Sequence, residues 1–169
     1  MALLNDTIES PRELFVHKLG AALTMEQTIL EMLDELEAKA DDPRLRRDLQ
    51  QHHKETEGQV ENLSRVFAAL GEAPKNQPCP TIEGLKEEGE TMLKEVDESL
   101  YDSVILSGVL ETEHHEIAVY DSLIITAEQM GDDDVIALLN ENVEQESATL
   151  QKAIKSAERL AQRVVRQTA

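Results

Sequence analysis

The chain has 169 residues, enough for one domain with a substantial hydrophobic core. Aromatic residues make up 2% of it, and Leu, Ala and Glu are plentiful, which favours an all-α protein. The formal net charge of -19 repels phosphate and therefore argues against nucleic acid or an anionic membrane as a partner. The N-terminus lacks the basic and apolar regions of a signal peptide, and no stretch approaches membrane-spanning length, so we expect a cytoplasmic protein.

Two long helices are predicted first. Ser10-Pro11-Arg12-Glu13 is a strong helix start and begins a helix over residues 11–38. Asp41-Asp42-Pro43 ends that helix and begins a second one over residues 43–70, which Gly71 terminates. Apolar residues recur at intervals of three and four along both helices. Because the joint between them is short, we expect an antiparallel hairpin.

The next segment, from Gly71 to about Ser99, predicts a crossover. Three prolines fix an extended stretch, and Thr81 then caps a short helix over residues 82–97. A connection of this length can travel back along a bundle, over roughly 40 Å. Such a crossover distinguishes a ferritin-like four-helix bundle from a simple up-and-down bundle.

Two more long helices complete the chain. Ser99 is the expected cap of a helix over residues 100–130, and Gly131 its expected end. The acids at 132–134 suit the positive end of a last helix, over residues 134–166. We therefore expect one ferritin-like helical domain over residues 1–169, with the extra short helix inside the crossover.

Acidic residues interrupt the apolar faces of all four long helices. A buried carboxylate is costly unless a positive group meets it, and helix bundles commonly resolve this with two metal ions. If the turns lie near residues 40 and 132, the acids of each hairpin fall at nearly the same height, close to mid-bundle. The candidate ligands are Glu26, Glu55, Glu113, Glu116 and Glu146.

A histidine accompanies these acids. His52 precedes Glu55 by three positions, just as Glu113 precedes Glu116, so the members of each pair share a helix face. Imidazole with several carboxylates suits iron or manganese, with zinc as a substitute. Groups placed to orient the ligands through hydrogen bonds are Tyr120, Thr56 and Gln59, with His114 flanking the site.

A competing motif lies on the third long helix. Glu111-x-x-His114 matches the Glu-x-x-His pattern of di-iron bundles. Glu111 lies roughly 160° around the helix from Glu113, so the two motifs cannot serve one site. We favour Glu113 and Glu116 because their face also carries apolar residues and Tyr120. The alternative for every inward acid is a residue at the edge of an apolar face that ligates nothing.

Four strings of the sequence resemble the YciE/YciF-like family of ferritin-like stress proteins, and the resemblance covers most of the chain. The strings are Pro11-Arg12-Glu13-Leu14-Phe15, Lys54-Glu55-Thr56-Glu57-Gly58-Gln59-Val60-Glu61, Cys79 followed by Glu83-Gly84-Leu85, and Glu113-His114-His115-Glu116-Ile117-Ala118-Val119-Tyr120. The last of them is the most specific. One departure lies on the final helix, where Thr149 replaces the histidine of a Glu-x-x-His motif.

The resemblance implies a homodimeric ferritin-like bundle with a rubrerythrin-like dinuclear site. By position, the five glutamates above look like its carboxylate ligands and His52 like its histidine. The implied function is the handling of iron, dioxygen or peroxide under stress, with peroxidase-like or catalase-like turnover left open. The alternative is a non-catalytic dimeric helical scaffold without a functional metal site.

Overall fold

The structure, a computed structural model, describes residues 7–167 of the chain, with side chains up to residue 163. Within this range the chain forms α-helices and one short 3-10 helix. Their bounds are α1 Pro11–Lys39, α2 Pro43–Ala69, α3 Pro80–Glu95, η1 Glu98–Leu100, α4 Tyr101–Met130 and α5 Asp133–Gln167.

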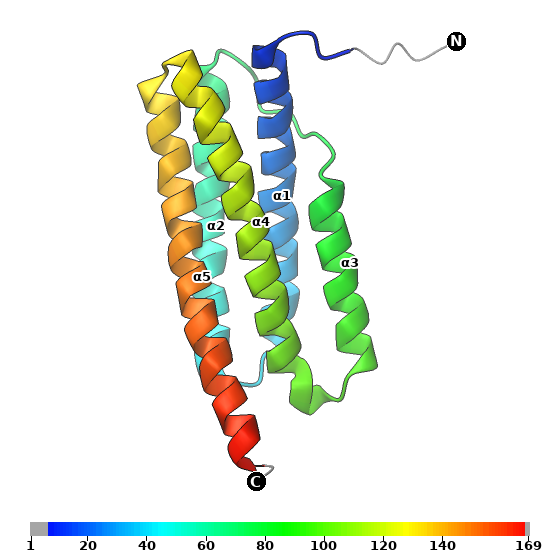
Figure 1. Cartoon of the computed structure of the whole chain (residues 1–169). Helices are drawn as coiled ribbons and strands as arrows, with labels where there is room; N and C mark the ends of the chain where they lie inside the picture. The colour runs from blue at the N-terminus through cyan, green and yellow to red at the C-terminus, as the bar shows by residue number, and fades with distance from the viewer. Residues whose placement is uncertain (1–6, 168–169) are drawn as a thin grey trace, which may run out of the picture.

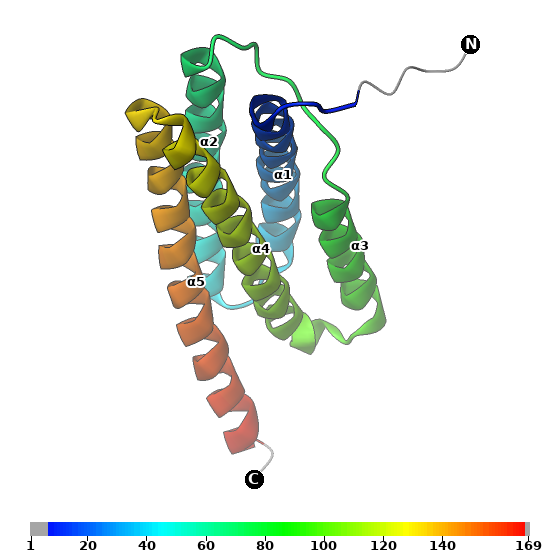
Figure 2. The same ribbon diagram turned by 45° about the horizontal axis from the view of Figure 1, so that its top comes forward.

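Helices α1, α2, α4 and α5 form a four-helix bundle, and each runs antiparallel to the two helices beside it (Figure 1). The connection after α2 crosses one end of the bundle, and α3 then runs down the outside against α1 and α4 (Figure 2). The predicted all-α bundle with a long crossover and an extra helix is confirmed. No helix of the described residues is long and apolar enough to cross a membrane.

The expected start and stop signals define the long helices. The Ser10 hydroxyl accepts a hydrogen bond from the Glu13 amide at 3.1 Å, and the Asp42 carboxylate accepts one from the Arg44 amide at 2.8 Å. Gly71 and Gly131 both have a φ of 72°, a left-handed conformation that favours glycine directly after a helix.

Two predicted caps are wrong. Thr81 lies inside α3, because Pro80 already occupies the first turn, where its fixed φ and missing N–H are tolerated. Ser99 lies within the short 3-10 helix, where its amide donates to the Asp97 carboxylate at 3.0 Å, and α4 begins at Tyr101. The sequence therefore predicted the existence of both helices, but α3 begins and ends two residues earlier than predicted and α4 begins one residue later.

The crossover is held against α1 by close backbone contact. The Gln77 amide donates to the Gly20 carbonyl at 3.1 Å, and a Cβ added at Gly20 would lie 2.4 Å from the carbonyl oxygen of Lys75. The Asn76 side chain donates to the Thr24 hydroxyl at 3.0 Å. Gly20 therefore allows the extended segment to approach the helix before α3 begins.

The core is apolar near both ends of the bundle and polar in its middle. Buried polar and charged side chains come from all four bundle helices and meet at the middle of their lengths. They include Glu26, His52, Thr56, Gln59, Asn62, Thr112, Glu113, Glu116, Asn142, Glu146 and Thr149.

Candidate metal centre

Four metal-ligating side chains converge in the polar middle of the bundle. They are His52 from α2, Glu113 and Glu116 from α4, and Glu146 from α5, and one ligand atom of each lies within 4.8 Å of those of the others. All four residues are buried. Glu113 and Glu116 can act together because residues three apart on a helix point to one side.

The oxygens of this cluster accept no hydrogen bond of normal geometry from the described residues, and the carboxyls lie close enough to share protons with one another. Among the described residues, neither oxygen of Glu113, Glu116 or Glu146 has such a hydrogen bond, and the same holds for Nδ1 of His52. His52 Nε2 lies 3.1 Å from Oε1 of Glu113, but without the alignment of a hydrogen bond. Buried polar atoms without partners are costly, so this set is suited to a cation that would contact all of them.

Glu26 approaches the cluster from α1. Its side chain is fully buried, and the hydroxyl of Tyr120 donates a hydrogen bond to Oε1, whereas Oε2 has no partner in the described part of the chain. Glu26 lies beside Glu116, close enough that a proton on one carboxyl can be shared with the other. Glu26 thus offers one free oxygen to the polar middle of the bundle.

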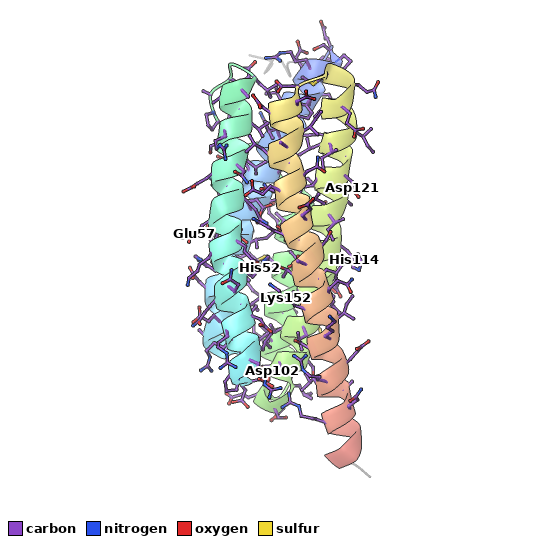
Figure 3. The ribbon with its side chains drawn as sticks, turned by 90° about the vertical axis from the view of Figure 1, so that its left-hand side faces the viewer. His52, Glu57, Asp102, His114, Asp121 and Lys152 are labelled. Atoms are coloured by element: carbon purple, nitrogen blue, oxygen red, sulfur yellow. The ribbon has the colours of Figure 1, made fainter. Side chains whose placement is uncertain are left out.

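Glu55 lies at the edge of the site and is not one of the four converging ligands. Its oxygens accept hydrogen bonds from the Gln51 amide at 2.9 Å and from the Thr149 hydroxyl at 3.3 Å. The ammonium group of Lys152 lies 3.8 Å from Oε1 of Glu55. In Figure 3, His52 and Lys152 are both labelled between α2 and α5, on the face where this edge meets solvent.

Burial shifts the acids strongly toward their protonated forms. Burial raises the pKa of Glu26 and of Glu113 to about 8, and the charge of a neighbouring acid adds to each shift. Burial and the charge of Glu113 raise the pKa of Glu146 to about 9. Burial followed by repulsion from Glu146 also places the pKa of Glu116 well above its usual value. Without a cation, the cluster therefore holds protons at neutral pH.

The groups expected to orient the ligands take different positions. Tyr120 contacts Glu26, as described, and burial raises its pKa. The Thr56 hydroxyl donates to the His52 backbone carbonyl at 3.0 Å. Gln59 is buried beside Glu146, although its side-chain amide makes no hydrogen bond of normal geometry within the described chain. His114 is exposed and lies on the outer side of α4 (Figure 3), and Glu111 is exposed as well.

Two asparagines that sequence reasoning missed support Tyr120. The Asn142 amide donates to the Tyr120 hydroxyl at 3.0 Å, and the Asn62 amide donates to Oδ1 of Asn142 at 2.9 Å. Arg65 in turn donates to Oδ1 of Asn62 at 3.0 Å. The available signal was spacing, since Asn142 lies one helical turn before Glu146 on the same face of α5.

Comparisons with known proteins identify the family. The family described as a domain of unknown function, DUF892, matches residues 10–166. The chain belongs to this family. Protein YciF of Escherichia coli K12 is 29% identical over 139 residues, which cover 81% of this chain and 84% of YciF. The resemblance to YciE/YciF-like proteins found in the sequence is thereby confirmed.

Solved structures agree with this family. YcfI of Rhodopseudomonas palustris superposes with a TM-score of 0.86 at 33% identity, and the match covers 89% of this chain and 97% of the YcfI chain. A structural role has been suggested for YcfI. The crystal structure of the E. coli stress protein YciF gives a TM-score of 0.83 at 28% identity, with 88% and 95% covered. The DUF892 chain therefore shares the helical fold of YciF over nearly its full length.

Proposed function

We propose that this protein binds two iron or manganese ions between its central helices and handles iron, dioxygen or peroxide under stress. The proposal rests on one observation, the convergence of four buried ligand groups whose oxygens lack hydrogen-bond partners in the described chain. The similarity to YciF, which is described as a stress protein, supports the proposed role under stress.

The donor set fits such ions. Imidazole with carboxylate oxygens is typical of iron and manganese sites, and zinc can take the same ligands. His52, Glu113, Glu116 and Glu146 would form the centre of the site. Two further glutamates would complete it: Glu26 through its free oxygen on α1, and Glu55 from its position at the α2/α5 edge.

When bound, the ions would supply the electron transfer that reduces dioxygen or peroxide. The polypeptide contributes the surroundings. Burial of the ligands excludes bulk water, and the Tyr120 hydroxyl holds one oxygen of Glu26 in place. The raised pKa values mean that the carboxyls must release protons before they can ligate a cation, so metal binding is coupled to proton release.

Metal analysis tests the proposal. Protein purified without chelators should retain Fe, Mn or Zn, and anaerobic titration with Fe(II) or Mn(II) should saturate near two ions per chain. Glu116→Gln should lose this binding, because it removes a buried anionic ligand. Glu57→Gln, at an exposed position of α2, is the matched control and should bind normally. A wild-type protein that neither retains nor takes up these metals would refute the proposal.

A non-catalytic dimeric scaffold is the second candidate. It is favoured by the proton-holding acids, which can hydrogen-bond to one another without a metal, as Glu26 and Glu116 are placed to do. The structural role suggested for YcfI points the same way. A ligand that binds the native state raises the melting temperature, so a melting temperature unchanged by Mn(II) or Fe(II) would favour the scaffold.

A further inference from the structure

Helix α3 covers a groove against the bundle, whose lining combines apolar side chains with the charged ones of Glu35, Lys86, Glu88, Glu90 and Glu111. The groove has a volume of about 230 Å³ and is lined by residues of α1, α3 and α4. Its apolar side chains include Met32 and Leu36 of α1, Leu85 and Leu93 of α3, and Val104 of α4. In Figures 1 and 2, α3 lies alongside α1 and α4 on the outside of the bundle. The groove is nearer to the surface than the ligand cluster, because its lining includes exposed Met92 whereas the four ligands are buried.

A second, smaller cavity lies between this groove and the ligand cluster. It has a volume of about 20 Å³, and its lining includes His52 and Glu113. The two cavities share three lining residues, Met32, Leu36 and Thr112. A cavity of this size holds one small molecule, since a single water needs about 10–15 Å³. One layer of side chains therefore separates the groove beneath α3 from two predicted metal ligands.

The chemistry of these walls favours a small neutral molecule. The shared residues are two apolar side chains and Thr112, whose hydroxyl is already engaged in donating to the Gly108 carbonyl at 2.7 Å. An apolar constriction admits dioxygen readily, whereas hydrogen peroxide and ions would have to give up hydrogen bonds with water to pass it.

A further cavity beside His52 lies on another side of the bundle. It has a volume of about 20 Å³ between α2, α4 and α5, and apolar side chains such as Leu49, Leu106 and Val109 form most of its lining. Its lining also includes Asp48, Thr149 and Lys152. These polar and charged side chains can replace part of the hydration of an ion or of peroxide. The cavity next to the groove beneath α3 has neither Asp48 nor Lys152 in its lining, which is apolar apart from His52, Thr112 and Glu113.

We propose that dioxygen reaches the metal site through the groove beneath α3, and that Met32, Leu36 and Thr112 form the constriction that admits it. This inference rests on the proposed metal-binding function for its target. The passage itself belongs to the protein without metal, so it can be tested separately.

The first test uses the paramagnetism of dissolved dioxygen in metal-free protein. Methyl groups of Ile29 and Leu33, which are buried and line the inner cavity, should show a several-fold larger relaxation enhancement under dioxygen pressure than the methyls of Leu139, which are similarly buried in the core away from both cavities. Equal enhancement at the three residues would overturn the route. Absence of metal binding would contradict the proposed function but would leave this result unaffected.

The second test narrows and widens the constriction in Fe(II)-loaded protein. Thr112→Leu should slow oxidation by dioxygen about tenfold while leaving oxidation by hydrogen peroxide and the Fe(II) stoichiometry unchanged. Thr126→Leu is the matched control, because Thr126 also lies on α4 and donates to the carbonyl four residues back, at 3.2 Å, without lining either cavity. Leu36→Ala should speed oxidation by dioxygen.

The Leu36→Ala variant also keeps the route testable if Thr112→Leu does not fold. Dioxygen and peroxide rates that change together in either variant would overturn the proposed selectivity. Dioxygen rates that change in neither folded variant would overturn the route.

Discussion

The buried hydroxyl of Tyr120 joins the ligand cluster to the polar core between α2 and α5. It donates to Glu26 and accepts from Asn142, so Tyr120→Phe leaves a carboxylate oxygen and an amide without their partner. We expect the free energy of unfolding to fall by about 1–3 kcal/mol. We also expect Mn(II) affinity to fall by about tenfold or more, because Glu26 is no longer held in place. Urea denaturation with chelator and calorimetric Mn(II) titration measure the two effects.

The chain's other tyrosine provides the control. Tyr101 is half-buried at the start of α4, where its ring lies 5.6 Å from the ammonium group of Lys39. Tyr101→Phe keeps that ring and should change neither stability nor metal affinity appreciably. Equal behaviour of the two variants would show that the Tyr120 hydroxyl has no special role.

Individual ligands could be predicted from the sequence where a strong local pattern surrounds them. Glu26 lies between apolar residues on one helix face, and that face has to be buried for the helix to pack. Glu55 lies at the edge of its face, and its orientation depends on Thr149 and Lys152, which belong to a helix distant in sequence. Asn142 could not be predicted from the sequence, because its partners Tyr120 and Asn62 belong to other helices and no local pattern indicates these contacts.

At the scale of elements, the fit of the crossover against α1 depends on Gly20. Helix propensity alone would favour alanine there by about 1 kcal/mol. A Cβ would however lie 2.4 Å from a backbone carbonyl oxygen of the crossover, which cannot rotate away as a flexible side chain can. We therefore expect Gly20→Ala to lower the free energy of unfolding by about 1–3 kcal/mol, as overpacking does.

At another helical glycine, Gly58, we expect substitution by alanine to raise the free energy of unfolding. Gly58 lies within α2, and a Cβ added there would meet nothing within 4 Å. Gly58→Ala should therefore stabilise the protein by up to about 1 kcal/mol through helix propensity alone. Urea denaturation of both variants tests the contrast, and stabilisation by both substitutions would show that the crossover is not tightly seated on α1.

The long helices could be predicted closely because their ends carry local signals. Each end of α1, α2, α4 and α5 differs from its expected position by at most one residue. Both ends of α3 differ by two residues, and at its start Pro80 and Thr81 each carry a signal for the first turn. No local signal specified how the crossover would pack, because its contact with Gly20 joins segments that are more than fifty residues apart.

At the scale of the whole molecule, two sets of acids destabilise the folded state without metal. The chain has 35 acidic and 16 basic residues, so surface carboxylates repel one another when they are ionised. The buried acids of the cluster add a separate contribution, because they resist ionisation in the interior. High salt distinguishes the repulsion between surface carboxylates from the cost of ionising the buried acids. In about 1 M KCl the screening length is about 3 Å, which suppresses the surface repulsion much more than the effect of the buried acids.

The raised pKa values of the buried acids predict how the free energy of unfolding depends on pH. Glu26 and Glu113 have folded-state pKa values of about 8 and Glu146 of about 9, against an ordinary value of 4.5. Above pH 4.5 the folded protein therefore retains protons that the unfolded chain has released. Stability without metal should be highest below pH 4.5 and fall as pH rises through about 9, by about 1.4 kcal/mol per pH unit for each retained proton.

Bound metal should reverse this trend. A cation requires the same carboxylates in their ionised form, so its affinity, and with it the stability of the loaded protein, should increase with pH. Urea denaturation in 1 M KCl between pH 5 and 8, with chelator or with saturating Mn(II), measures both slopes, and Glu116→Gln should flatten both. Equal slopes with and without Mn(II) would mean that the buried acids are not the ligands. Opposite slopes would link proton release directly to metal binding. The same four carboxyls would then hold protons in the metal-free state and cations in the loaded state, namely those of Glu26, Glu113, Glu116 and Glu146.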